Sequence, residues 1–592
     1  MQLQQTYDVF VLGATPAGIA CAVRAARQGM RVLLANRHHH IGGFITSGAG
    51  GWEGPYDGTR SPLLTEVQQR ASDHYRQTYG EGSPQHAASL PNPHTRRHID
   101  RRKIEPCVAE RIFEQLLTEH PTIHVVRGVD LAGVQRRHES IEQVTLTSLN
   151  SHQSAVIRAG VYVDCTYEGD LAAQAQVAYR VGRESRAEYG EPHAGRVFTR
   201  ALPHYAEPSV WPRDAAEGRL NLRHFPHAKE QIISPESTGE ADHCVMAYNY
   251  RLILTSNPAN RLPIRQPAAY DPEMVRHLPF GSMVPNLPND KVAWNAGRLI
   301  GPHHAYPEAN WPTRQQISQV YLNAILSQLW FLQNDSSVPP PVRSRFQELG
   351  LPRDEFTDNG HLPYEIYVRE ARRIVGRYVF TQHDAILQPG QARTTIHADS
   401  VAITDWPLDS VACTSLQIDG GDQDGALFLS ESSRPAQIPY RCLLPRDCAN
   451  LLVGVCISAS HVGFGTIRLE PVWMQLGEVA GYAAAQAITD NKSVSDIDVH
   501  ALQQRLVNDG ACITFFNDVN VAAAQPWTKA IQWLGTKGFF DSYDAQPGDC
   551  LDQSTADAWT RKGQELFSKT TVLKLGITRA DAALRIYKEC SV

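Results

Sequence analysis

The sequence lacks three features, and each absence argues against one class of protein or site. No apolar run approaches the ~20 residues needed to span a bilayer. Its 592 residues carry a formal net charge of -6, without the basic excess of a nucleic-acid-binding protein. None of the 11 cysteines forms a C-x-x-C pair, the spacing typical of zinc sites, iron–sulfur clusters and redox-active dithiols. We therefore expect no membrane, no nucleic acid and no metal as partners, and buried thiols in a reducing compartment.

The N-terminal residues also lack a recognisable secretory signal. The first expected strand begins by Tyr7, which leaves no room for a charged segment, an apolar segment and a cleavage site. This favours a cytoplasmic protein. A hydrophobic content of 42% and a charged content of 20% indicate a globular chain, long enough for two to four domains.

The first stretch with a clear pattern is DVFVLGATPAGIACAVRAARQGMRVLLAN, residues 8–36. Residues 8–12 are an apolar run that ends at a glycine and predicts a buried parallel strand. Residues 17–28 predict an alanine-rich helix, and residues 31–35 predict the next strand. The stretch therefore predicts a βαβ unit.

This unit keeps two glycines of the G-x-G-x-x-G dinucleotide fingerprint. Gly13 would permit a sharp turn and Gly18 close packing of helix and strand. Thr15 replaces the middle glycine, but its hydroxyl could donate a hydrogen bond to a phosphate, and Pro16 suits the first helical turn. Asn36 replaces the usual acidic residue; it can bind a ribose hydroxyl without charge. This motif alone leaves a cofactor site and a ligand-free structural turn equally open.

A second glycine-rich segment, HHHIGGFITSGAGG, follows at residues 38–51. Its glycines indicate backbone that lies close against an extended ligand. The three histidines could form a metal cluster or hold a covalent flavin through His40. We favour a solvated, partly basic loop, because consecutive residues do not converge on one ion.

The rest of the chain divides by composition. Residues 183–358 are richer in Pro, Asn and His and predict an inserted α+β substrate domain with pockets built from loops. Tight strand and helix patterns return within residues 359–492, with a strand at 450–455 and a small-residue helix at 470–488. Residues 493–592 predict a mainly helical region, a cap or an oligomer contact.

Six separated motifs together resemble one family. They are GATPAG (13–18), IGGFITSGAGG (41–51), DCTYEGDLAAQAQVAYRVGRESRAEYGE (164–191), YVREARRIVGRYV (367–379), PYRCLLPRDCANLLVGVCISASHVGFGTIRLEPVWMQLGEVAGYAAA (439–485) and LQQRLVNDGA (502–511). In this order they resemble FAD-dependent oxidoreductases of the glutathione-reductase-like flavoprotein superfamily. The subgroup is FAD-oxidored, related to the flavin domain of heterodisulfide reductase, although the iron–sulfur cysteines of those relatives are absent.

The resemblance implies an α/β fold in which residues 1–182 and 359–492 form a Rossmann-like domain for one non-covalent FAD. Backbone and side chains of the glycine-rich segments would contact the pyrophosphate, ribose and flavin. The predicted cofactor-binding residues are Gly13, Thr15, Pro16, Ala17, Gly18, Asn36, Arg37, Gly42, Gly43, Phe44, Val129, Asp164, Cys165, Thr166, Gly465, Thr466 and Ile467.

The segment HVGFGTIRLEP, residues 461–471, predicts the catalytic groups. A helix that starts near Glu470 would turn its N-terminal dipole towards the reduced flavin. His461 is the expected base, since imidazole accepts protons near neutral pH, or it only hydrogen-bonds the loop. Arg468 and Glu470 would form an ion pair, or Arg468 would hold an anionic flavin or substrate.

A row of arginines precedes this segment. Arg369, Arg372 and Arg373 lie three to four residues apart and predict one helix face. They could bind an acidic substrate, but we favour pairing with carboxylates such as Glu365 and Glu370.

These expectations combine into a function. We expect hydride transfer from a small organic donor, such as a CH–OH group of a carbohydrate-like molecule, to flavin, with an unknown electron acceptor. Alternatives are a reaction at a C–C bond and a flavin-binding electron-transfer protein. A nicotinamide domain is not expected, because only one dinucleotide unit is visible.

Overall fold

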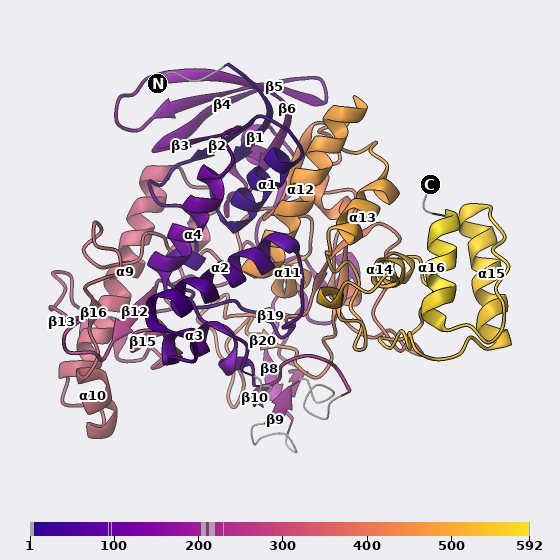
Figure 1. Cartoon of the computed structure of the whole chain (residues 1–592). Helices are drawn as coiled ribbons and strands as arrows, with labels where there is room; N and C mark the ends of the chain where they lie inside the picture. The colour runs from indigo at the N-terminus through magenta and orange to yellow at the C-terminus, as the bar shows by residue number, and fades with distance from the viewer. Residues whose placement is uncertain are drawn as a thin grey trace.

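The computed structural model describes residues 5–92, 94–95, 97–202, 209–211, 219–228 and 230–590. Part of the predicted inserted domain therefore lies outside the described residues. The largest sheet lies near the N-terminus, and helices α1 (Pro16–Arg27) and α12 (Glu470–Asp490), which are far apart in the sequence, lie beneath it (Figure 1).

Five parallel strands form the core of this sheet, although they come from distant parts of the sequence. Their spatial order is β3 (Ile123–Arg127), β2 (Val32–Asn36), β1 (Thr6–Leu12), β6 (Ser154–Asp164) and β22 (Leu451–Val453). The predicted βαβ unit is confirmed, and the α/β fold with it. The strand expected at residues 450–455 is shorter than predicted.

An antiparallel layer grows from the same sheet because β6 is long enough to serve both. The first half of β6 pairs with β5 (Ser140–Ser148), and β5 pairs with β4 (Val129–Arg137). Sequence patterns did not indicate β4. Val129, one of the predicted cofactor-binding residues, begins this strand.

Helices α1 (Pro16–Arg27) and α12 (Glu470–Asp490) lie side by side against the sheet (Figure 1). Small residues make this contact possible. A Cβ added at Gly477 would lie 2.0 Å from the carbonyl oxygen of Ala17, and one at Gly481 would lie 2.6 Å from that of Cys21. The predicted helix at residues 470–488 is confirmed, and it packs on the glycine-turn unit.

The region between the two halves of this domain has its own small sheet. Strand β15 (Lys291–Asn295) lies between β12 (Arg251–Thr255) and β14 (Ser282–Leu287). The long helix α9 (Trp311–Asn334) follows them and lies at the left of Figure 1. The exact domain boundaries stay a prediction.

The C-terminal region is helical, as predicted. It contains α13 (Val499–Asn508), α14 (Thr528–Gly535), α15 (Gln553–Phe567) and α16 (Arg579–Cys590), and the last two lie at the right of Figure 1. Trp533 of α14 stacks on Phe567 with ring centroids 5.0 Å apart. Among the described residues, no helix combines the length and the apolar character that a membrane crossing requires.

Candidate active site

The turn after β1 leaves no space for a side chain at Gly13 or at Gly18. Gly13 has a φ of 95°, and a Cβ there would lie 2.8 Å from the carbonyl oxygen of Cys165. A Cβ at Gly18 would lie 1.8 Å from the carbonyl oxygen of Gly13. These short distances explain why the two outer positions of the fingerprint require glycine.

Thr15 serves the protein itself. Its hydroxyl donates to the carbonyl oxygen of Cys165 at 2.8 Å and accepts from the backbone N–H of Gly18 at 3.3 Å. It is the N-cap of α1, with Pro16 in the first turn. Because its single proton is already donated, the predicted hydroxyl donation to phosphate is not available in this arrangement. Ala17 faces Gly477 of α12.

Asn36 is likewise engaged within the chain. Its Oδ1 accepts from the backbone N–H of Ala14 at 2.9 Å. Its Nδ2 donates to the carbonyl oxygens of His38 at 3.0 Å and His40 at 2.9 Å. The amide therefore ties β2 to the histidine loop and to the glycine turn. Its contact with a ribose stays a prediction.

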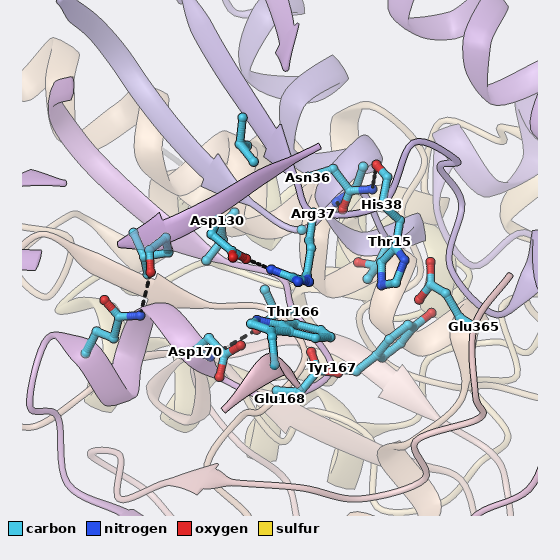
Figure 2. A pocket seen from close by; sticks show the side chains of 17 residues that line it. Thr15, Asn36, Arg37, His38, Asp130, Thr166, Tyr167, Glu168, Asp170 and Glu365 are labelled. Atoms are coloured by element: carbon cyan, nitrogen blue, oxygen red, sulfur yellow. Dashed lines mark hydrogen bonds and ion pairs between the residues drawn. The ribbon is translucent and has the colours of Figure 1, made fainter. Parts of the chain in front are cut away.

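A cavity opens where β1, β2 and the start of β4 meet (Figure 2). Of the predicted cofactor residues, six line it: Gly13, Thr15, Asn36, Arg37, Val129 and Thr166. Arg37 forms an ion pair with Asp130, and its guanidinium lies 4.4 Å from the ring centroid of Trp311. Sequence reasoning missed Asp130 and Trp311, which no motif marks.

The turn after β6 forms another wall of this cavity. Asp164 accepts hydrogen bonds from the backbone N–H and hydroxyl of Thr166, at 3.0 and 2.7 Å, and from the backbone N–H of Ala172 at 2.9 Å. Burial raises the pKa of Asp164 to about 6. Asp164 and Cys165 therefore shape the turn from inside, and Thr166 is the member that reaches the cavity.

This arrangement fits a dinucleotide such as FAD. The cavity lies at the carboxyl ends of parallel strands, where such folds bind their ligands. Glycine keeps the backbone bare at Gly13, and the first turn of α1 has no acidic side chain to repel a phosphate. Arg37 also lines the cavity, with its charge paired to that of Asp130. The described residues therefore suit the adenosine diphosphate half.

The Gly42–Phe44 segment connects this cavity to a second region. A Cβ at Gly43 would lie 2.2 Å from the Tyr167 hydroxyl oxygen, and the Phe44 N–H donates to that oxygen at 2.9 Å. Tyr167 donates in turn to Glu470 Oε1 at 2.6 Å. A Cβ at Gly42 would lie 2.4 Å from the methyl group of Thr46, so both glycines are needed for packing.

Glu470 is a buried carboxyl at the start of α12. Burial raises its pKa to about 8, and no described residue binds its Oε2. A mainly protonated carboxyl leaves the positive end of the α12 dipole free of a neutralising charge. The alternative of an ion pair between Glu470 and Arg468 is wrong, because Glu470 binds Tyr167 instead.

Arginines gather around Tyr367. The ring of Phe44 stacks on that of Tyr367 at 3.9 Å between centroids. The guanidinium groups of Arg251 and Arg369 lie 5.0 and 4.5 Å from the same ring, and Arg468 Nη1 donates to the Tyr367 hydroxyl at 2.9 Å. Arg468 also pairs with Asp409 at 2.5 Å. We call Arg251, Arg369, Arg468 and the nearby Arg298 the arginine cluster.

The row Arg369, Arg372 and Arg373 does not lie on a helix, so that prediction is wrong. The segment is extended, with Tyr367 bridged to Asn249 and Arg373 in a short strand, β17 (Arg373–Ile374). The three side chains therefore diverge. Arg373 pairs with a carboxylate as favoured, and Arg372 binds Asp170 at 2.9 Å. Among the described residues, the hydrogen bonds of Arg369 go to neutral oxygens.

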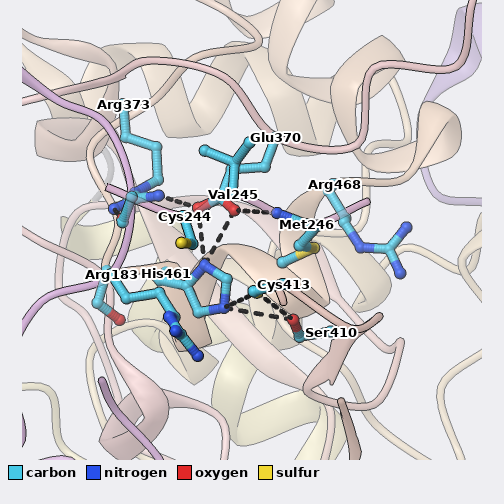
Figure 3. A network of polar contacts seen from close by, with 12 residues as sticks. Arg183, Cys244, Val245, Met246, Glu370, Arg373, Ser410, Cys413, His461 and Arg468 are labelled. Atoms are coloured by element: carbon cyan, nitrogen blue, oxygen red, sulfur yellow. Dashed lines mark hydrogen bonds and ion pairs between the residues drawn. The ribbon is translucent and has the colours of Figure 1, made fainter. Parts of the chain in front are cut away.

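His461 opens α11 (His461–Ile467) and lies between an acid and two weakly polar groups (Figure 3). Its Nδ1 is 2.9 Å from Glu370 Oε2, and its Nε2 is 3.3 Å from Ser410 Oγ and 3.9 Å from Cys413 Sγ. Arg373 pairs with the same Glu370 carboxylate. Glu370 therefore fixes the ring so that Nε2 faces Ser410. Sequence reasoning missed Ser410, which belongs to no motif.

The residues after His461 turn towards the protein interior. A Cβ at Gly465 would lie 2.7 Å from the carbonyl oxygen of Asp409. Thr466 donates to the carbonyl oxygen of Trp406 at 2.5 Å, and Ile467 is fully buried. None of the three lines the dinucleotide cavity. The structure gives all three packing roles, and their contact with flavin stays a prediction.

A second cavity, of about 330 Å³, borders the arginine cluster, and Arg298 is part of its lining. Its walls come mainly from residues 295–298, 409–412 and 422–428, and Ser410 is part of its lining. Asp409, on the same wall, binds Arg468, which binds Tyr367, which stacks on Phe44. A continuous set of contacts thus joins this cavity to the glycine-rich segment. A cavity of this size suits a small organic ligand.

Comparisons with known proteins complete the description. Residues 8–506 match the model of a family described as FAD dependent oxidoreductase. Comparison with curated proteins finds no match.

Solved structures match at low similarity. OxyS anhydrotetracycline hydroxylase from Streptomyces rimosus matches with 16% identity and a TM-score of 0.22, over 34% of this chain and 39% of its own. The flavin-dependent monooxygenase PieE, in complex with FAD and substrate, matches with 13% identity and a TM-score of 0.19, over 33% and 35%. THI4 from Thermovibrio ammonificans matches with 16% identity and a TM-score of 0.22, over 30% and 67%.

This chain thus spans less than half of OxyS and of PieE. The family match, in contrast, runs from the first strand to the helix after α12 and includes both parts of the dinucleotide domain. The chain belongs to the FAD dependent oxidoreductase family and is an enzyme that uses FAD.

Proposed function

We propose that the protein oxidises a small organic substrate bound in the second cavity, and that His461 receives the proton released there. FAD, held at its diphosphate half by the Gly13 turn and Arg37, supplies the hydride-accepting group. The observation that carries this proposal is the buried Glu370–His461 pair, which reaches the cavity wall through Ser410.

Glu370 is a positioning residue in this scheme. When its carboxylate accepts from Nδ1–H, the neutral imidazole must carry its lone pair on Nε2. Arg373 pairs with this carboxylate and the backbone N–H of Met246 donates to it at 3.2 Å, so the carboxylate is held in place. The ring is thereby oriented as a base.

Ser410 provides the route for the proton. Its hydroxyl lies on the cavity wall, 3.3 Å from His461 Nε2. In the structure this hydroxyl donates its proton to the carbonyl oxygen of Val411 at 3.0 Å. In the reaction it would turn from that carbonyl, pass its proton to His461 and take one from the substrate. A donor that loses a hydroxyl proton together with a hydride, such as a CH–OH group, suits this geometry.

The test is reduction of the flavin under anaerobic conditions, followed by stopped-flow absorbance with a panel of polyols, hydroxy acids and amines. We expect one class to bleach the flavin and His461→Gln to slow this roughly 10²- to 10⁴-fold. Glu370→Gln should lower kcat without raising KM. His277→Gln, at an exposed histidine, is the control and should leave both unchanged.

Two results would contradict the proposal. If no donor bleaches the flavin, the protein acts in electron transfer only. If His461→Gln reduces at the same rate as His277→Gln, another group takes the proton.

A further inference from the structure

The second cavity contains a cation that has no partner among the described residues. Arg298 follows β15, is half-buried and lines the cavity. Within the described ranges, no residue makes a hydrogen bond or an ion pair with its guanidinium group. Two other buried arginines are paired: Arg183 binds Asp424 at 2.8 Å, and Arg314 binds Asp170 at 2.6 Å.

The surroundings of Arg298 hold three further arginines, and not all of them have a carboxylate partner. Two members of the arginine cluster have carboxylates, since Arg251 binds Glu53 at 2.8 Å and Arg468 binds Asp409. Arg369 binds the neutral oxygens of Ala247 at 2.5 Å and Asn249 at 2.8 Å. Among the described residues, neither Arg298 nor Arg369 has a carboxylate in contact. Asp409 attracts Arg298 from the same cavity wall, and Asp422, which binds Thr199 and Gln231, is the other carboxylate of the lining.

These cations act on one another. Burial, and after it the neighbouring Arg251, lower the pKa of Arg298. A guanidinium nevertheless stays protonated in proteins, so the unpaired charge persists and makes an anion favourable at this place.

We propose that Arg298 binds an anionic group of the substrate, so that the enzyme acts on small carboxylates. The reaction in this proposal rests on the proposed function, whereas the binding of the anion does not depend on it. The planar guanidinium matches a carboxylate with two parallel hydrogen bonds. With the carboxylate on Arg298, the rest of a small acid remains in the same cavity as Ser410.

The test uses acetate, propionate and benzoate, each compared with its neutral amide, as probes of the FAD-loaded protein. Binding is followed by calorimetry and by the shift of the flavin absorbance. We expect at least one acid to bind roughly 10- to 100-fold more tightly than its amide, the ratio typical of a charge-assisted pair. Arg298→Gln should remove this preference.

Three controls separate the roles of the residue. Arg265→Gln, at an exposed arginine, should keep the preference. The affinity for FAD, measured by flavin fluorescence, should be unchanged in Arg298→Gln. The melting temperature of the ligand-free Arg298→Gln protein should equal or exceed that of the wild type, because an unpaired charge is removed.

The proposal is overturned if no acid binds better than its amide, or if Arg298→Gln leaves the preference intact. It is also overturned if Arg298→Gln lowers the affinity for FAD, since the guanidinium would then serve the cofactor. A preference for acids in a protein whose flavin no donor reduces would support the anion site and contradict only the proposed oxidation.

Discussion

The dinucleotide cavity and the second cavity are built by different means. The first is formed by backbone within short stretches of sequence, such as Gly13–Gly18, whose conformation a neighbouring strand and helix impose. The second collects side chains from separate loops, with Arg298, Ser410 and His461 each on a different segment. One site depends on where side chains are absent, and the other on which side chains meet.

This difference explains how the two sites respond to change. Added atoms damage the first cavity because its carbonyl oxygens leave no space. Altered charge or altered hydrogen bonding damages the second, where volume is available but partners are few. The comparison can therefore be tested with substitutions that add atoms and with substitutions that alter charge or hydrogen bonding.

The largest effect is expected in the glycine turn. In Gly18→Val, the Cβ would collide with the carbonyl oxygen of Gly13, at 1.8 Å, so β1 and α1 must separate. We expect loss of FAD binding and a fall of about 3 kcal/mol or more in the free energy of unfolding. Flavin fluorescence titration and urea denaturation measure the two effects.

Gly133→Ala is the matched control, because a Cβ there meets no atom within 4 Å. Wild-type FAD affinity in Gly18→Val would show that the turn adapts, and would remove the steric account of this site.

A smaller effect is expected at the edge of the first cavity. In Asn36→Asp, a carboxylate would face the carbonyl oxygens of His38 and His40, which now accept from the amide. Two lost donors and the new repulsion should cost about 1–3 kcal/mol of unfolding free energy. Thermal and urea denaturation of the ligand-free protein measure this.

Asn221→Asp, at an exposed position, is the control. If Asn36→Asp instead gains stability and binds FAD more tightly, the acidic residue that is usual at this position would be the better choice, and the side chain would act on the ribose.

The third effect appears only as the pH rises and concerns Glu470, which lies between the two sites. Its folded pKa of about 8 exceeds the ordinary 4.5, so the folded state holds this proton more tightly than the unfolded state. The resulting stability is present below about pH 4.5 and is lost as the pH rises towards 8. Glu470→Gln removes this loss without changing the shape of the side chain.

We therefore expect the melting temperature of ligand-free Glu470→Gln, relative to wild type, to rise between pH 5 and pH 8. The accompanying gain in the free energy of unfolding should be about 3 kcal/mol over these three pH units, since one pKa unit corresponds to about 1.4 kcal/mol. Glu565→Gln, at an exposed carboxyl, should show no such trend. An equal difference at both pH values would indicate that Glu470 is already ionised.

The local pattern predicted more of the first site than of the second. The glycine spacing and the apolar runs sufficed for the βαβ unit, because each strand or helix there follows its neighbour directly. Asn36 was identified as a departure from the fingerprint, but its hydrogen-bond partners were not. The sequence does not show that the loop at His38–His40 folds back on the Asn36 amide. The arginine row failed because pairing with Asn249 and Arg180 overrides its helical spacing.

The sequence by itself determined the parallel sheet, the glycine turn and the packing of α1 on α12, because these depend on periodicity and on residue size over short distances. Only the tertiary structure decided that Glu370, His461 and Ser410 form one chain of contacts, and that Arg298 lies beside them with no partner among the described residues. Side chains on separate loops have no fixed spacing in the sequence, and their charges are balanced or left unbalanced only when the chain has folded.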